Sequence, residues 1–378
     1  MPSATPLPSG PSHLALFGAD DLLRPDGCPA CRYVADARDR FLAWFALEAH
    51  ADPDMLTRLC RSLGFCAVHA SEMLSQPGAD GRMTAVYTYL LRAAARYLAK
   101  GTSPSAPCLG CTRDDEAAER ALDTLLAGLQ EPDTRDRYRA ARGLCLPHLR
   151  AAAPRAGRRL TAWLAQDTLA RLSASPPDLA LLAGNPAPLP PVRSGLCRAC
   201  VMACRLERDA IDDPGSPPAG VVRAGPSAGL CPRHLRDACA GPDAAPVLAA
   251  EAERALAWLA GAASPPRGFA GLAGRGRQRA AACPACGSAG TPGDQAARAV
   301  RATSDQPPQM CLRHVIALRD RDPRSADRLV RSAGDRTRAL LAELEEASRK
   351  RSWQHRHEPR GPEMTAWRRA ATLVDGRV

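Results

Sequence analysis

Aromatic residues, lysine and long hydrophobic runs are all scarce in this chain of 378 residues. Phe, Trp and Tyr make up 4% of the sequence, and only Lys100 and Lys350 among 51 basic residues are lysine, which we interpret as a bias of coding composition. No run of 18 uncharged apolar residues is present, so the sequence predicts no transmembrane helix and no membrane partner. No basic segment precedes the short apolar stretch at residues 14–17, so we expect no export signal. These absences predict a soluble protein of the reducing cytoplasm, where cysteines remain thiols that can bind metal.

The signatures of common enzymes are missing as well. The sequence contains no recognisable Ser-His-Asp set, phosphate-binding loop or dinucleotide-binding fingerprint. An enzyme is therefore the weakest of the functional classes considered below, and no catalytic residue is predicted.

A repeated pattern of metal ligands stands out instead. Four times, a Cys-x-x-Cys pair is followed by a Cys-x-x-His pair after 24 to 34 intervening residues. Together these pairs use 12 of the 15 cysteines and 4 of the 8 histidines. The four sets are Cys28, Cys31, Cys66 and His69; Cys108, Cys111, Cys145 and His148; Cys197, Cys200, Cys231 and His234; and Cys283, Cys286, Cys311 and His314.

Three thiolates and one imidazole form a complete tetrahedral shell for zinc, and a two-residue spacer lets both members of a pair reach one ion. The pattern therefore predicts about four structural zinc ions, each bound within its own set. An iron–sulfur cluster, disulfides and redox-active dithiols are the alternatives. The Cys-Pro-Ala-Cys segments that begin at Cys28 and Cys283 resemble a thioredoxin-like motif, but no strand-rich βαβ pattern precedes them.

The first cysteines recur 80, 89 and 86 residues apart, which indicates an internal repeat of about 85 residues. The fold class predicted is all-α, with four tandem zinc-stapled helical repeats, the later two shortened, and a basic C-terminal tail. The predicted order is a leader at 1–24, repeat 1 at 25–101, repeat 2 at 102–174, a Pro-rich linker at 175–193, repeat 3 at 194–263, a basic Gly-rich linker at 264–281, repeat 4 at 282–350 and the tail at 351–378.

Apolar residues at helical spacing place the expected helices. Repeat 1 predicts helices over 33–47, from Asp52-Pro53 to Gly64, and over 83–98, with Asp52 as N-cap. A helical hairpin would then bring Cys66 back beside Cys28. Repeat 2 predicts helices near 112–129, 133–142 and 156–173. Repeat 3 keeps 201–211 and 247–259, whereas repeat 4 predicts only a long charged helix at 325–349, because residues 287–309 are polar and contain Gly and Pro.

The basic charge is concentrated at the C-terminal end. Residues 264–378 hold 22 basic and 12 acidic residues, a net of +10, whereas residues 1–263 hold 29 and 28. Arginine forks pair with phosphate oxygens and an aromatic ring can stack on a base, so nucleic acid is a candidate partner of this end. A solvated tail in an arginine-rich protein is the interpretation that we prefer, because residues 325–349 mix acids with arginines and no recognition-helix motif is present. The candidate nucleic-acid-binding residues are Arg275, Arg277, Arg279, Arg349, Lys350, Arg351 and Trp353.

Three cysteines, Cys60, Cys204 and Cys239, fall outside the four sets. We interpret them as small buried hydrophobic residues, although Cys204 follows Cys200 by four residues and could replace a ligand or act as a reactive neighbour.

The Cys-Pro-x-Cys pairs, the Gly-[Phe/Leu]-Cys-x-x-His segments and the closing residues 363–370 resemble an uncharacterised bacterial family of helical Cys/His proteins. The resemblance covers most of the chain and supports the ligand assignment and a bacterial cytoplasmic setting. It provides no catalytic residues. Repeat 4 departs from the pattern, because Gln309-Met310 replace the Gly-apolar pair before Cys311.

Two functional classes follow from these features. The first is a non-catalytic zinc-binding adaptor or regulator that binds a protein or nucleic acid. The second is a thiol-based redox or metal sensor, in which oxidation of a Cys3His site ejects zinc and unfolds the segment that it held.

Overall fold

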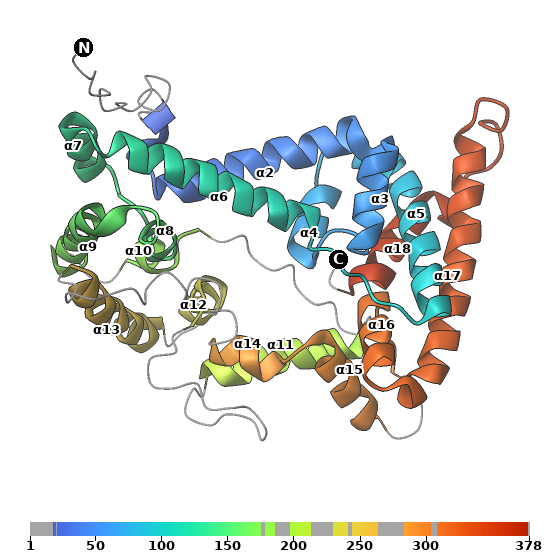
Figure 1. Ribbon diagram of the computed structural model, residues 1–378. Coiled ribbons are helices and arrows are strands. Elements are labelled where there is room, and N and C mark those ends of the chain that lie inside the picture. The colour runs from blue at the N-terminus through green and yellow to red at the C-terminus, as the bar shows by residue number, and fades with distance from the viewer. Residues whose placement is uncertain are drawn as a thin grey trace, which may run out of the picture. The chain divides into compact units, whose positions relative to one another are not determined.

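The computed structural model describes residues 18–19, 21–174, 178–185, 197–212, 230–240, 244–263, 283–303 and 308–376. Throughout these residues the regular structure is helical, and no strand occurs in them. The all-α prediction is therefore confirmed for the described part of the chain (Figure 1). The chain divides into two compact units, which are described separately.

The first compact unit consists of residues 1–37, 114–186 and 224–283, and the second of 38–113, 187–223 and 284–378. Two long helices contribute to both units: α2 (Pro29–Leu47) and α6 (Leu109–Gly128). Neither unit coincides with one of the predicted repeats. The boundaries of those repeats remain a prediction.

The first compact unit is built mainly from α6 and six further helices. Helices α9 and α13 pack side by side (Figure 1) over a core that includes Leu122, Leu125, Tyr138 and Leu144, all almost fully buried. The Tyr138 hydroxyl accepts a hydrogen bond from the backbone N–H of Leu144 at 2.9 Å, which fixes the segment before Cys145. These six helices are α7 (Pro132–Ala140), α8 (Leu146–Ala152), α9 (Gly157–Ala174), α10 (Leu179–Ala183), α12 (Pro232–Cys239) and α13 (Ala244–Ala263).

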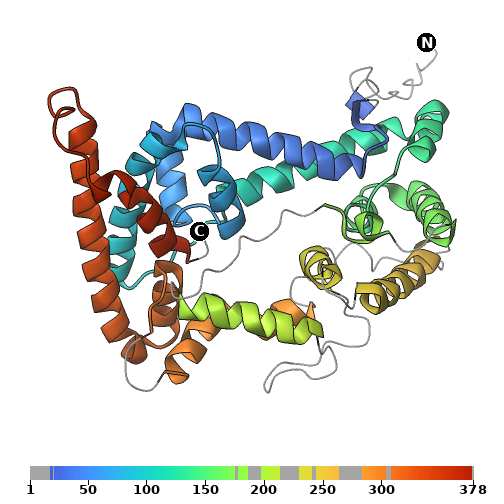
Figure 2. The same cartoon turned by 180° about the vertical axis from the view of Figure 1, so that it is seen from behind.

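In the second compact unit, α5 packs along the long helix α17, as Figure 1 and Figure 2 both show. Phe41, Phe45 and Phe65 form an aromatic cluster in its core, with ring centroids 5.2 to 6.4 Å apart. The elements are η1 (Ala49–Ala51), α3 (Pro53–Arg61), α4 (Ala67–Leu74), α5 (Ala79–Lys100), α11 (Arg198–Asp212), α14 (Pro284–Ala289), α15 (Pro292–Arg301), α16 (Leu312–Arg321), α17 (Pro323–Arg351), η2 (Pro362–Thr365) and α18 (Ala366–Asp375).

The expected helix start at Asp52 is confirmed. The Asp52 carboxylate accepts a hydrogen bond from the Met55 backbone N–H at 2.8 Å, which satisfies one of the N–H groups that a helix start leaves unpaired. Gly64 has φ +90°, and its N–H donates a hydrogen bond to the carbonyl of Leu59. This left-handed residue closes the end of α3, as the prediction of a helix ending at Gly64 expected.

Two predictions for the C-terminal part are wrong. Residues 287–309 were expected to lack a helix, but α15 forms there, because Thr291 and Asp294 build a reciprocal capping box. Residues 351–378 were expected to be a tail, but η2 and α18 fold within them, and Trp367, Ala370 and Val374 are buried in the core of the second compact unit.

Candidate metal centres

The sixteen predicted ligands come together in four Cys3His groups. Within each group the ligand atoms all lie within 4.8 Å of one another, so each could hold a metal ion. The first group is Cys28, Cys31, Cys145 and His148; the second is Cys66, His69, Cys108 and Cys111; the third is Cys197, Cys200, Cys311 and His314; and the fourth is Cys231, His234, Cys283 and Cys286.

The predicted pairing within each repeat is wrong. The Cys-x-x-Cys pair of repeat 1 joins the Cys-x-x-His pair of repeat 2, and the remaining pairs of these repeats join each other. Repeats 3 and 4 exchange their pairs in the same nested way. The physical reason lies in unequal helix lengths. The 19 residues of α2 carry the chain about 28 Å, but the nine residues of α3 return it only about 14 Å, so α3 does not carry the chain back to Cys28, and Cys66 joins Cys108 and Cys111 instead.

Every ligand pair occupies the start of a helix. Cys66, Cys145, Cys231 and Cys311 are the N-cap residues of α4, α8, α12 and α16, with ψ between 158° and 167°. Each Cys-x-x-Cys pair likewise opens α2, α6, α11 or α14. Two helix N-termini therefore meet at each group, and their partial positive charge stabilises thiolates.

The spacing of the ligand atoms fits a single tetrahedral ion. Sulfur atoms lie 3.7 Å apart between Cys31 and Cys145, and again between Cys66 and Cys111. In the first and second groups, the histidine Nδ1 atom lies 3.1 to 3.7 Å from the sulfurs. A tetrahedral zinc ion with Zn–S bonds of about 2.3 Å and a Zn–N bond of about 2.0 Å needs S–S edges of about 3.8 Å and S–N edges of about 3.5 Å.

Crowding of the thiols drives their pKa values apart. Hydrogen bonds from Cys111 and Cys66 lower the pKa of Cys108 far below its usual range, whereas the same contact with Cys108 raises the pKa of Cys111. Burial lowers the pKa of His148, but hydrogen bonds to the sulfurs of Cys28 and Cys31 together outweigh burial and raise that pKa to about 10. Like charges this close cannot all ionise unaided, and a divalent cation among them would stabilise every thiolate.

A hydrogen bond behind the third group orients its imidazole. The His314 Nε2 atom lies 2.7 Å from the Gln295 side-chain oxygen, and the Gln295 amide donates to the Gly290 carbonyl. An Nε2–H group that donates to Gln295 leaves Nδ1 free of a proton, and Nδ1 is the atom 3.1 Å from the Cys311 sulfur. Gln295 was not predicted, because no sequence pattern relates it to His314.

Two glycines close the first and third groups. Gly184 follows α10 with φ +70°, and a Cβ atom there would lie 2.9 Å from the sulfurs of Cys31 and Cys145. The next backbone N–H, that of Asn185, donates to the Cys31 sulfur at 3.4 Å.

Gly376 repeats this arrangement after α18. Its φ is +71°, and a Cβ atom would lie 3.0 Å from the Cys200 sulfur. Both glycines were missed, although the segments 181–184 and 373–376 share a Leu-apolar-x-Gly pattern that comparison of the two halves of the chain would have revealed.

Arg313, inside the third group's Cys311–His314 pair, links this group to the segment before Cys66. Its guanidinium donates to the carbonyls of Leu63 and Phe65 at 2.8 and 2.7 Å and pairs with the buried Asp375 carboxylate at 2.7 Å. The second and third groups are thereby connected within the second compact unit.

The cysteines outside the groups are all half-buried. Burial raises the pKa of the Cys60 thiol, and the nearby Arg96 lowers it by less. Burial also raises the pKa of Cys239. Among the described residues, Cys60, Cys204 and Cys239 belong to no metal-binding group.

The candidate nucleic-acid-binding residues are divided by the structure. Arg275, Arg277 and Arg279 lie outside the described residues. The next three candidates have partners within the protein. Arg349 pairs with Glu346 and Glu358, and Lys350 pairs with Glu346 and Glu363. Arg351 donates a hydrogen bond to the Thr84 hydroxyl. Trp353 is 75% exposed.

Comparison with protein-family models, with curated proteins and with solved structures finds no match to this chain. Among the described residues, no helix is both long and apolar enough to cross a membrane.

Proposed function

We propose that the chain is a non-catalytic zinc protein in which four ions staple its helices. The observation that carries this proposal is the closed character of the groups. Each supplies four protein ligand atoms, and in the first and third groups a glycine backbone packs against the sulfurs. A catalytic zinc keeps one position open for water or substrate, whereas a structural zinc takes all four ligands from protein.

The ligand spacing supports zinc over an iron–sulfur cluster. A cluster of several irons lies between its cysteines and holds them farther apart than a single ion does, whereas here all ligand atoms of a group lie within 4.8 Å. When bound, each zinc would supply no chemistry beyond charge neutralisation and cross-linking. The chain's own residues would orient the ligands, as Gln295 does for His314.

Metal analysis of purified full-length protein tests this proposal. About four zinc ions per chain are expected, and X-ray absorption should report sulfur-rich tetrahedral coordination with Zn–S distances of about 2.3 Å. Stoichiometric iron, with the visible absorption of a cluster, would overturn the assignment, as would fewer than two zinc ions after expression in zinc-replete medium.

We further propose that this scaffold acts as an adaptor or regulator that binds a protein or nucleic acid. The exposed Trp353 ring is followed by the exposed Arg356 and Arg360, which could contact a phosphate backbone and a base together. A pull-down with single-stranded and duplex nucleic acid at about 50 and 200 mM salt tests the nucleic-acid branch, because phosphate contacts weaken steeply with salt. Absence of nucleic-acid binding at the lower salt concentration would contradict the nucleic-acid branch and leave a protein as the proposed partner.

A thiol-based sensor is the second candidate, favoured by unequal burial of the groups. All four ligands of the third group are buried, whereas Cys66, Cys108 and Cys111 of the second group are half-buried. Because oxidation follows thiolate access, peroxide should release zinc from the second group before the third. Peptide mapping of oxidised cysteines after a peroxide titration tests this order; simultaneous oxidation of both groups would contradict the sensor hypothesis.

A further inference from the structure

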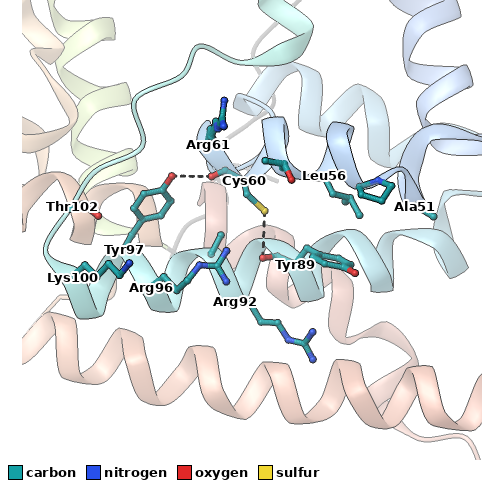
Figure 3. A pocket seen from close by; sticks show the side chains of 13 residues that line it. Ala51, Leu56, Cys60, Arg61, Tyr89, Arg92, Arg96, Tyr97, Lys100 and Thr102 are labelled. Carbon is teal, nitrogen blue, oxygen red and sulfur yellow. Dashed lines mark hydrogen bonds between the residues drawn. The ribbon is translucent and has the colours of Figure 1, made fainter.

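Helices α3 and α5 of the second compact unit border a pocket of about 600 Å³, shown in Figure 3. Its interior is largely apolar. Leu56 and Ala93 are buried at its base, the Cys60 thiol and the Tyr97 ring lie in its wall, and the Tyr89 ring is 48% exposed. Pockets of 300–1,000 Å³ with an apolar lining and a few polar groups are typical of small-molecule sites.

The charges at this pocket are all of one sign. Arg61, Arg92, Arg96 and Lys100 line it, and no acidic residue does. Arg92 is neutralised by Glu345, with an N–O distance of 2.8 Å. In the described part of the chain, Arg61, Arg96 and Lys100 have no ion-pair partner. Three cations without an acidic partner therefore line one pocket, whereas the guanidinium of Arg313 in the same unit pairs with Asp375 and bonds backbone carbonyls.

Hydrogen bonds hold the pocket wall in place without a ligand. The Tyr97 hydroxyl donates to the Cys60 carbonyl at 3.2 Å, and the Cys60 thiol donates to the Tyr89 carbonyl at 3.7 Å, as the dashed lines in Figure 3 mark. The two helices are therefore tied together across the pocket, and a ligand would meet a preformed surface.

We propose that this pocket binds a small organic anion, with a phosphate or carboxylate group on an apolar body about the size of an aromatic ring. The cations of Arg96 and Lys100, on α5, would bind the anionic group, with Arg61 at the end of α3 as a third positive charge. The apolar body would lie on Leu56, Ala93 and the Tyr89 ring. Both parts are needed, because the charges alone would suit free phosphate and the apolar base alone would suit a neutral molecule.

This site is independent of the metal centres. Cys60 is not a ligand of any Cys3His group, and no histidine lines the pocket, so the thiol is available as a reporter of occupancy. Binding of an anion here would require neither the adaptor nor the sensor role proposed above.

The experiment uses full-length, zinc-loaded protein and measures alkylation of Cys60 by iodoacetamide, read on the Cys60 peptide by mass spectrometry. The probes are phenyl phosphate, inorganic phosphate and phenol. Phenyl phosphate should slow alkylation at concentrations where the other two have little effect. Calorimetric titration of phenyl phosphate provides a second readout that does not depend on the thiol.

The double substitution Arg96→Gln/Lys100→Gln should weaken phenyl phosphate binding at least roughly tenfold, because contacts between charged groups are lost. Arg58→Gln is the control. Arg58 is exposed on α3, the other helix that borders the pocket, but it does not line the pocket, so this substitution removes a positive charge without touching the site. Binding to Arg58→Gln should equal that of the unmodified chain.

Three results would overturn the proposal. The first is that phenyl phosphate gives neither protection nor heat, the second is that inorganic phosphate protects as well as phenyl phosphate, and the third is that Arg58→Gln weakens binding as much as the pocket substitutions. Unchanged zinc content and helicity of the variants exclude unfolding as the cause of any loss.

Discussion

Substitution of two cysteines at a time tests the nested pairing of the metal groups. Cys28 and Cys145 belong to the same group, so Cys28→Ser, Cys145→Ser and their double variant should each lose one and the same ion. Cys28→Ser combined with Cys66→Ser should lose two, because these cysteines belong to different groups. Pairing within each repeat would give the reverse: two ions lost from the first double variant and one from the second.

The energetic effect of losing the first ion can be worked out from the chain. Cys28 and His148 are 120 residues apart, and a cross-link that closes a loop of this length removes about 5 kcal/mol of chain entropy from the unfolded state. Structural zinc sites bind with apparent free energies on the order of 10 kcal/mol, so a chain that lacks this ion should lose at least about 5 kcal/mol of unfolding free energy. The loss should be the same for the Cys28→Ser, Cys145→Ser and double variants, because one ion is removed in all three.

Native mass spectrometry counts the ions that each variant retains after treatment with a chelator of moderate strength. Denaturant unfolding at a fixed excess of zinc measures the stability, since bound metal shifts the folding equilibrium. The nested arrangement is refuted if the Cys28→Ser/Cys145→Ser variant retains two ions while the Cys28→Ser/Cys66→Ser variant retains three.

The remaining predictions concern residues that support the ligands. Gln295→Ala should weaken zinc binding at the third group by about 10- to 100-fold in chelator competition, because His314 loses the acceptor that orients it; unchanged affinity would remove Gln295 from this role. Arg313→Leu should lower the unfolding free energy by about 3–5 kcal/mol in zinc excess, since the Asp375 carboxylate, 3% exposed, is left without its partner; a loss below about 1 kcal/mol would contradict that account. Gly184→Ala should destabilise the first group by more than the approximately 1 kcal/mol expected for Gly157→Ala, because Gly184 lies at φ +70° and ψ −149°, where only glycine fits readily, and packs against sulfurs, whereas a Cβ on Gly157 would meet nothing; equal losses in thermal unfolding would contradict both reasons.

Much of the local structure follows from short-range rules that act within a few residues. The Asp52 side chain caps α3 because an oxygen at that position reaches an unpaired N–H two or three residues on. The two-residue spacers commit Cys28 and Cys31 to one ion for the same reason, since both side chains project from the first turn of one helix. The sequence alone therefore specifies the start of α3, the ligand types and the number of candidate metal centres, but it missed α15 and α18.

The number of residues between ligand pairs does not decide which pairs bind the same ion. The pairing depends on the lengths and directions of α2, α3 and α6 together. The 20 residues of α6 span about the same length as the 19 residues of α2. Equal helices could have returned Cys66 to Cys28. The lengths were readable from the sequence, but their consequence appears only when the helices are placed in space.

Contacts between distant segments were decided entirely by the tertiary structure. Gly184 meets Cys31 and Gln295 meets His314 because packed helices bring together residues that have no shared local pattern. The same holds for the pocket, where Cys60 on α3 faces Arg96 on α5. Local chemistry determined which residues could bind metal or charge, whereas packing determined their neighbours, because burial is a property of the whole compact unit and not of any one segment.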